Sequence, residues 1–393
     1  MHLRFRSWLS VSGFLVACGS PSQSSGPATP GSGDSGSGSN QADGRSGSDA
    51  SAGSSSGGSG SPSIDSGAGS TSSGSGGGST SSGSSSGGSG TDASPPADGA
   101  SPPSAGTKFV GNITTNGAVR SDFATYWNQI TPENEGKWGS VEATQGTFNW
   151  TALDAIHTYA QSHGVVFKEH NFIWGSQQPS WIANLSASQQ QAAVQAWMQA
   201  FCGRYPDTKL IDVVNEPPPH TTPSYANGIG GSGASGYDWI VNAFKWARAA
   251  CPNAILVLND YNNIEYSADN SHFIAIVNAI KAAGAPIDAI GAQAHDAYKL
   301  SASTVQGFLD KLAATGLPVY ITEYDINLAD DTQQETVMQT EFPMFWNDSN
   351  VKGITLWGYI VGSTWEANTG LMTSSGTMRP AMSWLVDFLK THP

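Results

Sequence analysis

Two glutamates near the ends of apolar runs are the strongest candidates for chemistry. Glu216 ends the run LIDVVNE and is followed at once by three prolines, which stop further regular structure. Glu323 lies within the run PVYITEYDI. Two carboxyl groups across a cleft can hydrolyse a glycosidic bond, because one donates a proton to the leaving oxygen while the other attacks the anomeric carbon or activates water. Either glutamate alone is explained as well by a structural salt bridge, so the hypothesis depends on the pair.

Aromatic and polar residues near the ends of other apolar runs would suit a sugar substrate. The apolar faces of pyranose rings stack on aromatic side chains, while sugar hydroxyls hydrogen-bond to amides, carboxylates, lysines and histidines. A lone tryptophan is more often core than platform, but two lie among glycines and polar residues in GITLWGYIVGSTW. The candidates are Glu133, Asn134, Lys137, Trp138, His170, Trp174, Trp181, Asn215, Asn259, Asp260, Tyr261, Gln293, His295, Asp325, Trp357 and Trp365.

Other chemistries are disfavoured by the same residues. The acidic neighbours of His170 and His295, which are Glu169 and Asp296, would point to the opposite faces of strands, and no HExxH pattern is present. A serine hydrolase is disfavoured because no G-x-S-x-G stands between a strand and a helix. We therefore expect neither a metal nor a cofactor.

The elements that would position these residues alternate along the chain. Apolar runs typical of buried strands cover 109–113, 127–134, 165–174, 210–216, 254–262, 286–295, 318–326 and 353–359. Helical periodicity covers 153–164, 186–201, 237–250, 271–284, 301–316, 331–342 and 379–390. Eight strands with helices between them predict an α/β fold, a closed (β/α)8 TIM barrel whose strand ends line one cleft. An open doubly wound sheet is the alternative, but no glycine-rich phosphate loop follows any strand.

Composition divides the chain into three parts. Residues 1–17 have the arginines and the short apolar run of a signal peptide, and this run is too short to span a bilayer. Residues 18–106 are almost all Ser and Gly, which predicts a disordered linker. Residues 107–393 carry nearly all the aromatic side chains and suit a single catalytic domain.

Cys18 directly follows Leu15-Val16-Ala17, which is similar to the lipobox of bacterial lipoproteins. Cleavage there would expose Cys18 for lipidation. The pattern predicts an exported protein that is lipid-anchored at the bacterial cell surface or outer membrane, with its domain on a long tether. The alternative is an ordinary signal peptide and a secreted protein.

The remaining cysteines bear on a disulfide, and the net charge bears on which partners the protein binds. Cys202 and Cys251 fall near the ends of predicted helices, and an oxidising compartment favours a disulfide between them, the alternative being two buried thiols. The chain has only 17 Lys and Arg and a formal net charge of −14, so nucleic acid is not an expected partner. A neutral polymer fits this charge better than a polyanion, and we expect a monomer.

Taken in order, the motifs TPENEGKW, HNFIW, DVVNEP, NDYN, GAQAH, ITEYDI and WGYIVGSTW resemble glycoside hydrolase family 10, the retaining endo-β-1,4-xylanases. The resemblance covers essentially all of residues 107–393 and implies xylan and xylo-oligosaccharides as substrates. It implies that Glu216 is the general acid/base, that Glu323 is the nucleophile, and that Asp325 holds His295. The implied substrate contacts are Glu133, Asn134, Lys137, His170, Trp174, Asn215, Tyr261, Gln293, His295, Trp357 and Trp365.

The resemblance also implies a mechanism. Glu323 would form a glycosyl-enzyme, while Glu216 would act first as acid and then as base for water, with the carboxyl groups roughly 5–5.5 Å apart. The charge of Glu323 should raise the pKa of Glu216, and His295 and Lys137 should hold Glu323 ionised. The sequence departs from the family at Gly175, where a second histidine is usual, and in the Pro- and Gly-rich stretch at 217–238, which could reshape the aglycone side.

Two other functions stay open. An endoglucanase or a relative of mixed specificity would use the same mechanism, and would differ by having room at the glycone subsites for a 6-hydroxymethyl group. A catalytically inactive carbohydrate-binding or adhesion protein is disfavoured, because both glutamates stand in intact motifs.

Overall fold

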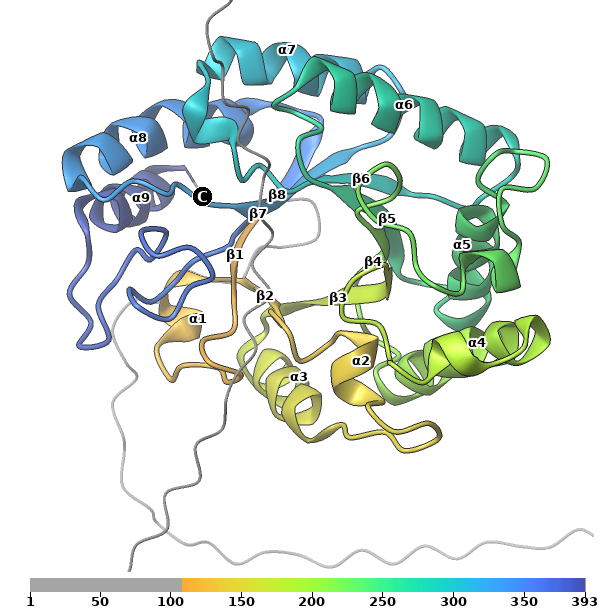
Figure 1. The fold of residues 1–393 in the computed structure, drawn as a ribbon. Coiled ribbons are helices and arrows are strands. Elements are labelled where there is room, and N and C mark those ends of the chain that lie inside the picture. The colour runs from red at the N-terminus through yellow and green to blue at the C-terminus, as the bar shows by residue number, and fades with distance from the viewer. Residues whose placement is uncertain (1–107, 393) are drawn as a thin grey trace, which may run out of the picture. The chain divides into compact units, whose positions relative to one another are not determined.

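Eight parallel strands close into a barrel in a computed structural model that describes residues 108–392 (Figure 1). The strands follow the order of the chain, and β1 pairs with β8 through Gly111 and Thr355, which closes the sheet. The predicted (β/α)8 barrel is confirmed, and the open sheet was the wrong alternative. The strands are β1 Phe109–Ile113, β2 Gln129–Thr131, β3 Val166–Trp174, β4 Leu210–Asn215, β5 Ile255–Asp260, β6 Ala289–Ala292, β7 Val319–Tyr324 and β8 Val351–Leu356.

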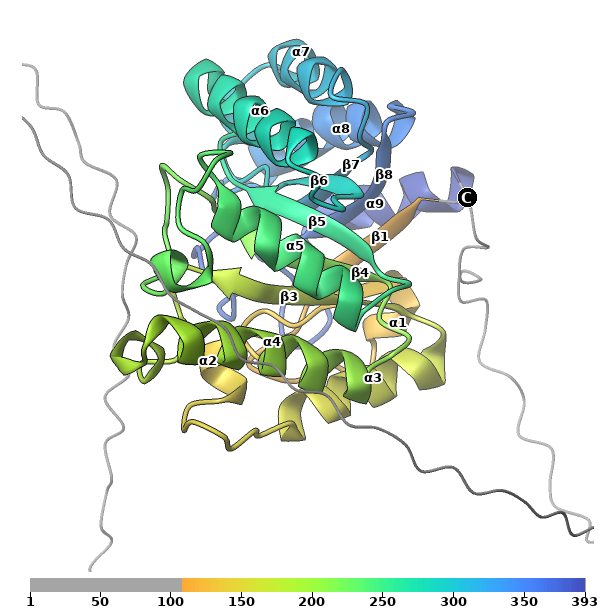
Figure 2. The same ribbon diagram turned by 90° about the vertical axis from the view of Figure 1, so that its right-hand side faces the viewer.

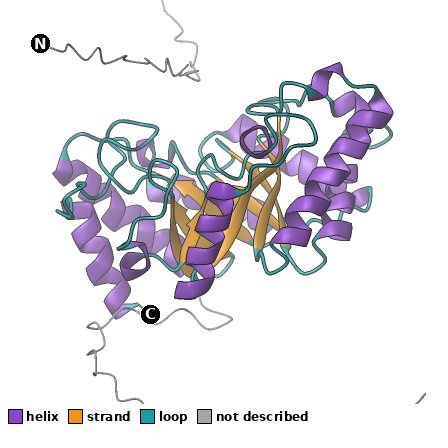
Figure 3. Ribbon diagram, turned by 90° about the horizontal axis from the view of Figure 1, so that it is seen from below, coloured by secondary structure: helices purple, strands orange, loops and turns teal. Residues whose placement is uncertain are grey.

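Helices lie around the strands (Figure 3), and α4, α5 and α6 follow one another along the outside of the sheet (Figure 2). The seven predicted helices are all present, whereas the four-residue helices α1 and α2 are too short to show periodicity in the sequence. The helices are α1 Phe123–Tyr126, α2 Trp138–Val141, α3 Thr151–His163, α4 Ala187–Arg204, α5 Asp238–Ala250, α6 Ser267–Ala282, α7 Ala302–Ala313, α8 Asp331–Asn347 and α9 Pro380–Thr391. Single 3-10 turns are η1 Ile182–Asn184, η2 Ala226–Ile229 and η3 Ala297–Lys299.

Most strands differ in extent from the sequence-based prediction, and β6 is shorter by three residues at each end. The run at 127–134 gives only the three residues of β2, because Pro132 has no N–H to continue the ladder. Strand β8 begins at Val351, two residues earlier than predicted, since the exposed Lys352 interrupts the apolar pattern that marks the rest of the strand. Gln293 and His295 therefore follow β6, and Asp325 and Trp357 directly follow β7 and β8, instead of lying within these strands.

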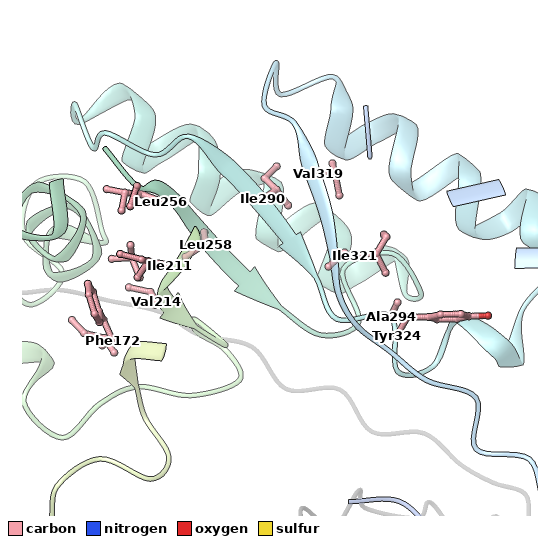
Figure 4. Packing of buried hydrophobic residues seen from close by; sticks show 14 of the residues in the cluster. Phe172, Ile211, Val214, Leu256, Leu258, Ile290, Ala294, Val319, Ile321 and Tyr324 are labelled. Atoms are coloured by element: carbon pink, nitrogen blue, oxygen red, sulfur yellow. The ribbon is translucent and has the colours of Figure 1, made fainter. Parts of the chain in front are cut away.

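Apolar residues fill two layers of the barrel. The larger layer packs the outer faces of the strands against the helices, and Figure 4 shows members of it such as Ile211, Leu258 and Ile290. A smaller cluster groups residues from the amino-terminal halves of their strands, and within it the rings of Phe109 and Tyr320 stack with centroids 5.7 Å apart. Polar side chains are thereby left to the carboxyl ends of the strands, where a (β/α)8 barrel carries its site.

Buried polar pairs inside the barrel join its strands to one another. Thr355 Oγ1 donates to Gln129 Oε1 at 2.7 Å and joins β8 to β2. Lys168 Nζ lies 2.7 Å from Asp212 Oδ2 and joins β3 to β4. These contacts offset part of the cost of burying such groups, and they tie the strands together inside the barrel.

A disulfide joins Cys202, near the end of α4, to Cys251, directly after α5, with their Cα atoms 5.4 Å apart. The expected disulfide is therefore present, rather than two thiols. The predicted signal peptide, the linker and Cys18 lie outside the described residues. Between residues 108 and 392, no helix has the length and apolar character needed to cross a bilayer.

Candidate active site

Glu216 and Glu323 lie at the same mouth of the barrel, because all eight strands run parallel. Glu216 directly follows β4, and Glu323 is the last residue but one of β7. Asn259 of β5 lies between them, and its Nδ2 donates to Glu323 Oε1 and to Asn215 Oδ1, each at 2.8 Å. Asn215 Nδ2 donates to Glu216 Oε1 at 3.4 Å. A chain of two amides therefore links the two carboxyl groups.

The position of Asn259 depends on its neighbours across the sheet. A Cβ at Gly291 on β6 would lie 2.2 Å from Asn259 Oδ1, so any side chain there would displace the amide. Thr322 Oγ1 donates to the same oxygen at 2.6 Å, which orients the amide with its Nδ2 toward Glu323. The strand pattern predicted Asn259 at the end of a strand but indicated no role for it, because these contacts join residues far apart in the chain.

Cationic side chains keep Glu323 ionised. His295 Nε2 lies 3.3 Å from Glu323 Oε2, and His170 Nδ1 lies 4.0 Å from Oε1. Burial by itself would raise the pKa of this carboxyl, but the charges of His170, His295 and Lys168, with a hydrogen bond from His295, lower it to about 2. Glu323 is therefore a carboxylate, which is the form that a nucleophile requires.

Asp325 holds His295 in place, as the sequence led us to expect. Asp325 Oδ2 lies 3.2 Å from His295 Nδ1 and accepts a hydrogen bond from Trp365 Nε1 at 2.7 Å. Burial favours the neutral imidazole, but the charges of Asp325 and Glu323 and their hydrogen bonds raise the pKa of His295 well above its ordinary value. His295 is thus a cation fixed between two carboxylates.

The surroundings of Glu216 favour its protonated form. Trp174 Nε1 donates to Glu216 Oε2 at 2.8 Å, and Gln293 Nε2 donates to Oε1 at 3.4 Å. Burial raises the pKa of Glu216, and the negative charge of Glu323 raises it further, against the opposing effect of the two hydrogen bonds. Glu216 therefore keeps its proton in a pH range in which Glu323 has already lost its own.

A second polar group lies beside Trp174, between the ends of β2 and β3. Lys137 Nζ donates to Asn134 Oδ1 at 2.9 Å and to Gln177 Oε1 at 2.7 Å, and it lies 4.8 Å from the centre of the Trp174 ring. Glu133 is largely buried next to it, and burial raises the pKa of Glu133 to about 7 despite the charge of Lys137. These groups can bind sugar hydroxyls on the β2 side of the carboxyl pair.

Lys137 was expected to hold Glu323 ionised by its charge and a hydrogen bond. No hydrogen bond joins the two side chains among the described residues, but their charges interact, since the charge of Glu323 opposes the lowering of the Lys137 pKa by burial. Both hydrogen bonds of the Lys137 side chain go to amide oxygens, those of Asn134 and Gln177. The main charges that lower the pKa of Glu323 are those of His170, His295 and Lys168. Gln177 was missed because it lies in the loop after β3, where no periodic pattern identifies an inward-pointing side chain.

The candidate tryptophans differ in how far their rings are exposed at the site. Trp365 is 49% exposed, and its ring lies over His295 with centroids 4.7 Å apart. Trp357 is buried against His170, with centroids 5.2 Å apart. Trp138 is only 2% exposed and packs edge-on against Trp181, so the prediction of Trp138 as a sugar platform was wrong.

On the opposite side of Glu216, the loop after β4 meets the end of β5. The rings of His220 and Tyr261 stack with centroids 3.8 Å apart. His220 Nδ1 lies 2.7 Å from Asp260 Oδ1, and Nε2 lies 3.6 Å from Asp269 Oδ1. Sequence analysis expected the contribution of Tyr261 but missed His220, whose place depends on how the proline-rich loop folds.

The arrangement can perform acid/base-assisted substitution at carbon. The pKa of one carboxyl is lowered, the pKa of the other is raised, and aromatic and amide groups surround both. Among residues 108–392, no group of three or more His, Cys, Asp and Glu is arranged to hold a metal ion.

The sequence is similar to a described family and to proteins named as xylanases. Residues 104–388 match the profile of the family described as glycosyl hydrolase family 10. Endo-1,4-beta-xylanase B of Cellvibrio japonicus is 49% identical over 282 residues, which cover 71% of this chain and 45% of that relative. This chain therefore matches less than half of that protein's length. Endo-1,4-beta-xylanase C of Phanerodontia chrysosporium is 31% identical over 309 residues, which cover 73% of this chain and 74% of the relative.

Solved structures share the fold. Native xylanase 10B from Thermotoga maritima superposes with a TM-score of 0.64 at 24% identity, covering 73% of this chain and 97% of that one. A GH10 protein from Paenibacillus barcinonensis superposes with a TM-score of 0.65 at 24% identity, covering 73% of this chain and 96% of that one.

Proposed function

The chain belongs to glycosyl hydrolase family 10, and from this premise we propose that it is a retaining endo-1,4-β-xylanase that cleaves internal bonds of xylan. The observation that carries the proposal is the pair of carboxyl groups at one mouth of the barrel, linked through the amides of Asn215 and Asn259. The pKa of Glu323 is lowered to about 2 and that of Glu216 is raised. The two relatives described above, named as endo-1,4-beta-xylanases, support xylan as the polymer.

In the first step, the carboxylate of Glu323 attacks the anomeric carbon of the sugar next to the cleaved bond. The bond to the glycosidic oxygen breaks, and Glu216 donates its proton to that oxygen so that the departing chain leaves as an alcohol. Asn259 and His295 keep the attacking carboxylate in one orientation through their contacts with its two oxygens. The product of this step is a glycosyl ester of Glu323.

In the second step, esterification has removed the negative charge of Glu323. That charge is one of the causes of the raised pKa of Glu216, so the pKa of Glu216 falls and its carboxylate can act as a base. Glu216 takes a proton from water, the water oxygen attacks the anomeric carbon, and the ester bond to Glu323 breaks. Two inversions leave the product with the configuration of the substrate.

The polymer would cross the mouth of the barrel from β2 to β5. We assign Glu133, Asn134 and Lys137 to the sugars on the glycone side, since they lie beside Trp174 on the ends of β2 and β3. We assign Tyr261 to the aglycone side. Trp365 would cover the sugar at the nucleophile, because its half-exposed ring lies over His295.

The proposal is tested by measuring reducing ends released from xylan and from carboxymethyl cellulose by the full chain. Glu323→Ala tests the nucleophile, and Glu335→Ala on the outer helix α8 is the matched control. Release from xylan that is lost only in Glu323→Ala would support the proposal. Stronger release from carboxymethyl cellulose would instead indicate an endoglucanase. Binding of xylan by a folded wild-type chain without release from either polymer would indicate a binding protein.

We also propose that the protein is exported, lipidated at Cys18 and displayed as a monomer at the bacterial surface or outer membrane. The support is the lipobox-like sequence before Cys18 and the long Ser- and Gly-rich stretch after it. Mass spectrometry of the amino-terminal peptide from expressing bacteria should find a diacylglycerol on Cys18, and Cys18→Ala should abolish it. An unmodified Cys18 would favour a secreted protein.

A further inference from the structure

The backbone of Glu216 has a conformation that its neighbours must hold. Its φ is +50°, in the left-handed region that is uncommon for residues other than glycine. Its N–H donates to the carbonyl oxygen of Asn259 at 2.8 Å, which fixes the amino-terminal side of Glu216 where the chain leaves β4. The three residues that follow are prolines, which have no N–H to donate back to the carbonyl of Glu216.

Thr221 supplies the donors that the prolines lack. Its backbone N–H donates to Glu216 O at 3.1 Å, and its hydroxyl donates to the same oxygen at 2.7 Å. The hydroxyl oxygen also accepts the N–H of Gly175 at 3.3 Å. Thr221 therefore closes the proline loop onto Glu216 and ties this loop to the end of β3.

Gly175 leaves the space that Thr221 occupies. A Cβ at position 175 would lie 2.7 Å from the Cβ of Thr221 and 2.8 Å from its hydroxyl oxygen, so any side chain there would displace the threonine. This contact gives a physical reason for glycine at the position where the family usually has a histidine. The preceding residue, Trp174, donates its indole N–H to the side-chain carboxyl group of Glu216.

We propose that Thr221 is a positioning residue that aims the acid/base Glu216, and that Gly175 is required for it. The inference deepens the proposed function and depends on it. Glu216 is held at three points: by Asn259 at its N–H, by Thr221 at its carbonyl, and by Trp174 at its carboxyl group. Loss of the threonine hydroxyl removes the shorter of the two hydrogen bonds to this carbonyl, and the tie to Gly175 with it, which lets the carboxyl group turn away from the leaving oxygen.

The test separates proton donation from the other parts of catalysis. Thr221→Val keeps the shape of the side chain and removes the hydroxyl. Its kcat/KM is measured on xylotetraose, whose leaving alcohol needs a proton, and on 2,4-dinitrophenyl β-xylobioside, whose leaving group does not. We expect a fall of roughly tenfold to hundredfold on xylotetraose and less than about twofold on the aryl substrate.

Three further variants complete the test. Thr221→Ser should restore most of the activity on xylotetraose, and Thr222→Val, at an exposed neighbouring position, should change neither substrate. Gly175→Ala, directly after β3, would displace Thr221 by its added Cβ. It should therefore show the same substrate dependence as Thr221→Val. Equal losses on both substrates, or no loss in Thr221→Val, would overturn the proposal. A wild-type chain inactive on xylotetraose would overturn the proposed function instead.

Discussion

The mouth of β4 and the mouth of β7 each present one glutamate, yet the two glutamates are prepared for opposite tasks. At β7, Glu323 has His170 and His295 within 4.0 Å, and its pKa falls to about 2. At β4, the hydrogen bonds to the Glu216 carboxyl come from the neutral groups of Trp174, Gln293 and Asn215, and its pKa rises. Burial pushes both carboxyls toward the protonated form, so the difference comes from the neighbours.

This difference shows how one fold obtains an acid and a nucleophile from the same side chain. The barrel brings both glutamates to one edge. The charges of His170, His295 and Lys168 around Glu323 lower its pKa and so decide which glutamate is ionised first. The negative charge of Glu323 then helps to keep the proton on Glu216. Between the two pKa values, kcat/KM should be highest, with an acidic limb set by Glu323 and a basic limb set by Glu216.

The largest effect is expected at β7. Glu323→Ala removes the nucleophile and should lower kcat/KM on the order of 10⁴-fold or more. The loss should be equally severe on xylotetraose and on 2,4-dinitrophenyl β-xylobioside, because both need the attack on carbon. Initial rates on the two substrates check this, with Glu335→Ala as the control. Retained activity on the aryl substrate would show that another group attacks.

The corresponding change at β4 should depend on the leaving group. Glu216→Ala removes the acid and should lower kcat/KM on xylotetraose by about 10²- to 10⁴-fold. The aryl substrate should lose far less at this step, since dinitrophenolate departs without a proton. The ratio of the two kcat/KM values measures the contrast with Glu323→Ala. Parallel losses on both substrates would contradict an acid role for Glu216.

A smaller effect is expected when one cation beside Glu323 is removed. His295→Asn should raise the pKa of Glu323, because the hydrogen bond and the charge of His295 both lower it. The acidic limb of kcat/KM against pH should therefore move to higher pH, and the rate on its plateau should fall roughly tenfold as the carboxylate loses orientation. His163→Asn, at an exposed position in α3, is the control. An unmoved acidic limb would mean that His295 does not act on Glu323.

The smallest effect should come from the indole beside Glu216. The hydrogen bond from Trp174 lowers the pKa of Glu216, so Trp174→Phe should raise that pKa and move the basic limb of the profile to higher pH. The acidic limb should stay in place, and kcat/KM should fall about tenfold or less. Trp346→Phe, a half-buried ring in α8, controls for loss of an indole. A basic limb that moved to lower pH would contradict this role of Trp174.

The sequence was most informative wherever a residue belongs to a strand. The eight apolar runs, the closed barrel and the strand-end placement of Glu216 and Glu323 all follow from local patterns. Loops were less predictable, since Gln177, His220 and Thr221 owe their roles to contacts with other loops and strand ends. Trp138 was misjudged because α2, a single helical turn, buries its ring in the core.

The division of roles between Glu323 and Glu216 is tested most directly by trapping the covalent intermediate. The full chain is treated with 2,4-dinitrophenyl 2-deoxy-2-fluoro-β-xylobioside. The fluorine slows both the formation and the hydrolysis of the glycosyl-enzyme, and the reactive leaving group makes the formation fast again, so that the intermediate accumulates. Peptide mass spectrometry should then find the fluorinated disaccharide on Glu323. A label on Glu216 or on another residue, or turnover of xylotetraose that first releases the inverted anomer, would contradict the assignment of Glu323 as the nucleophile.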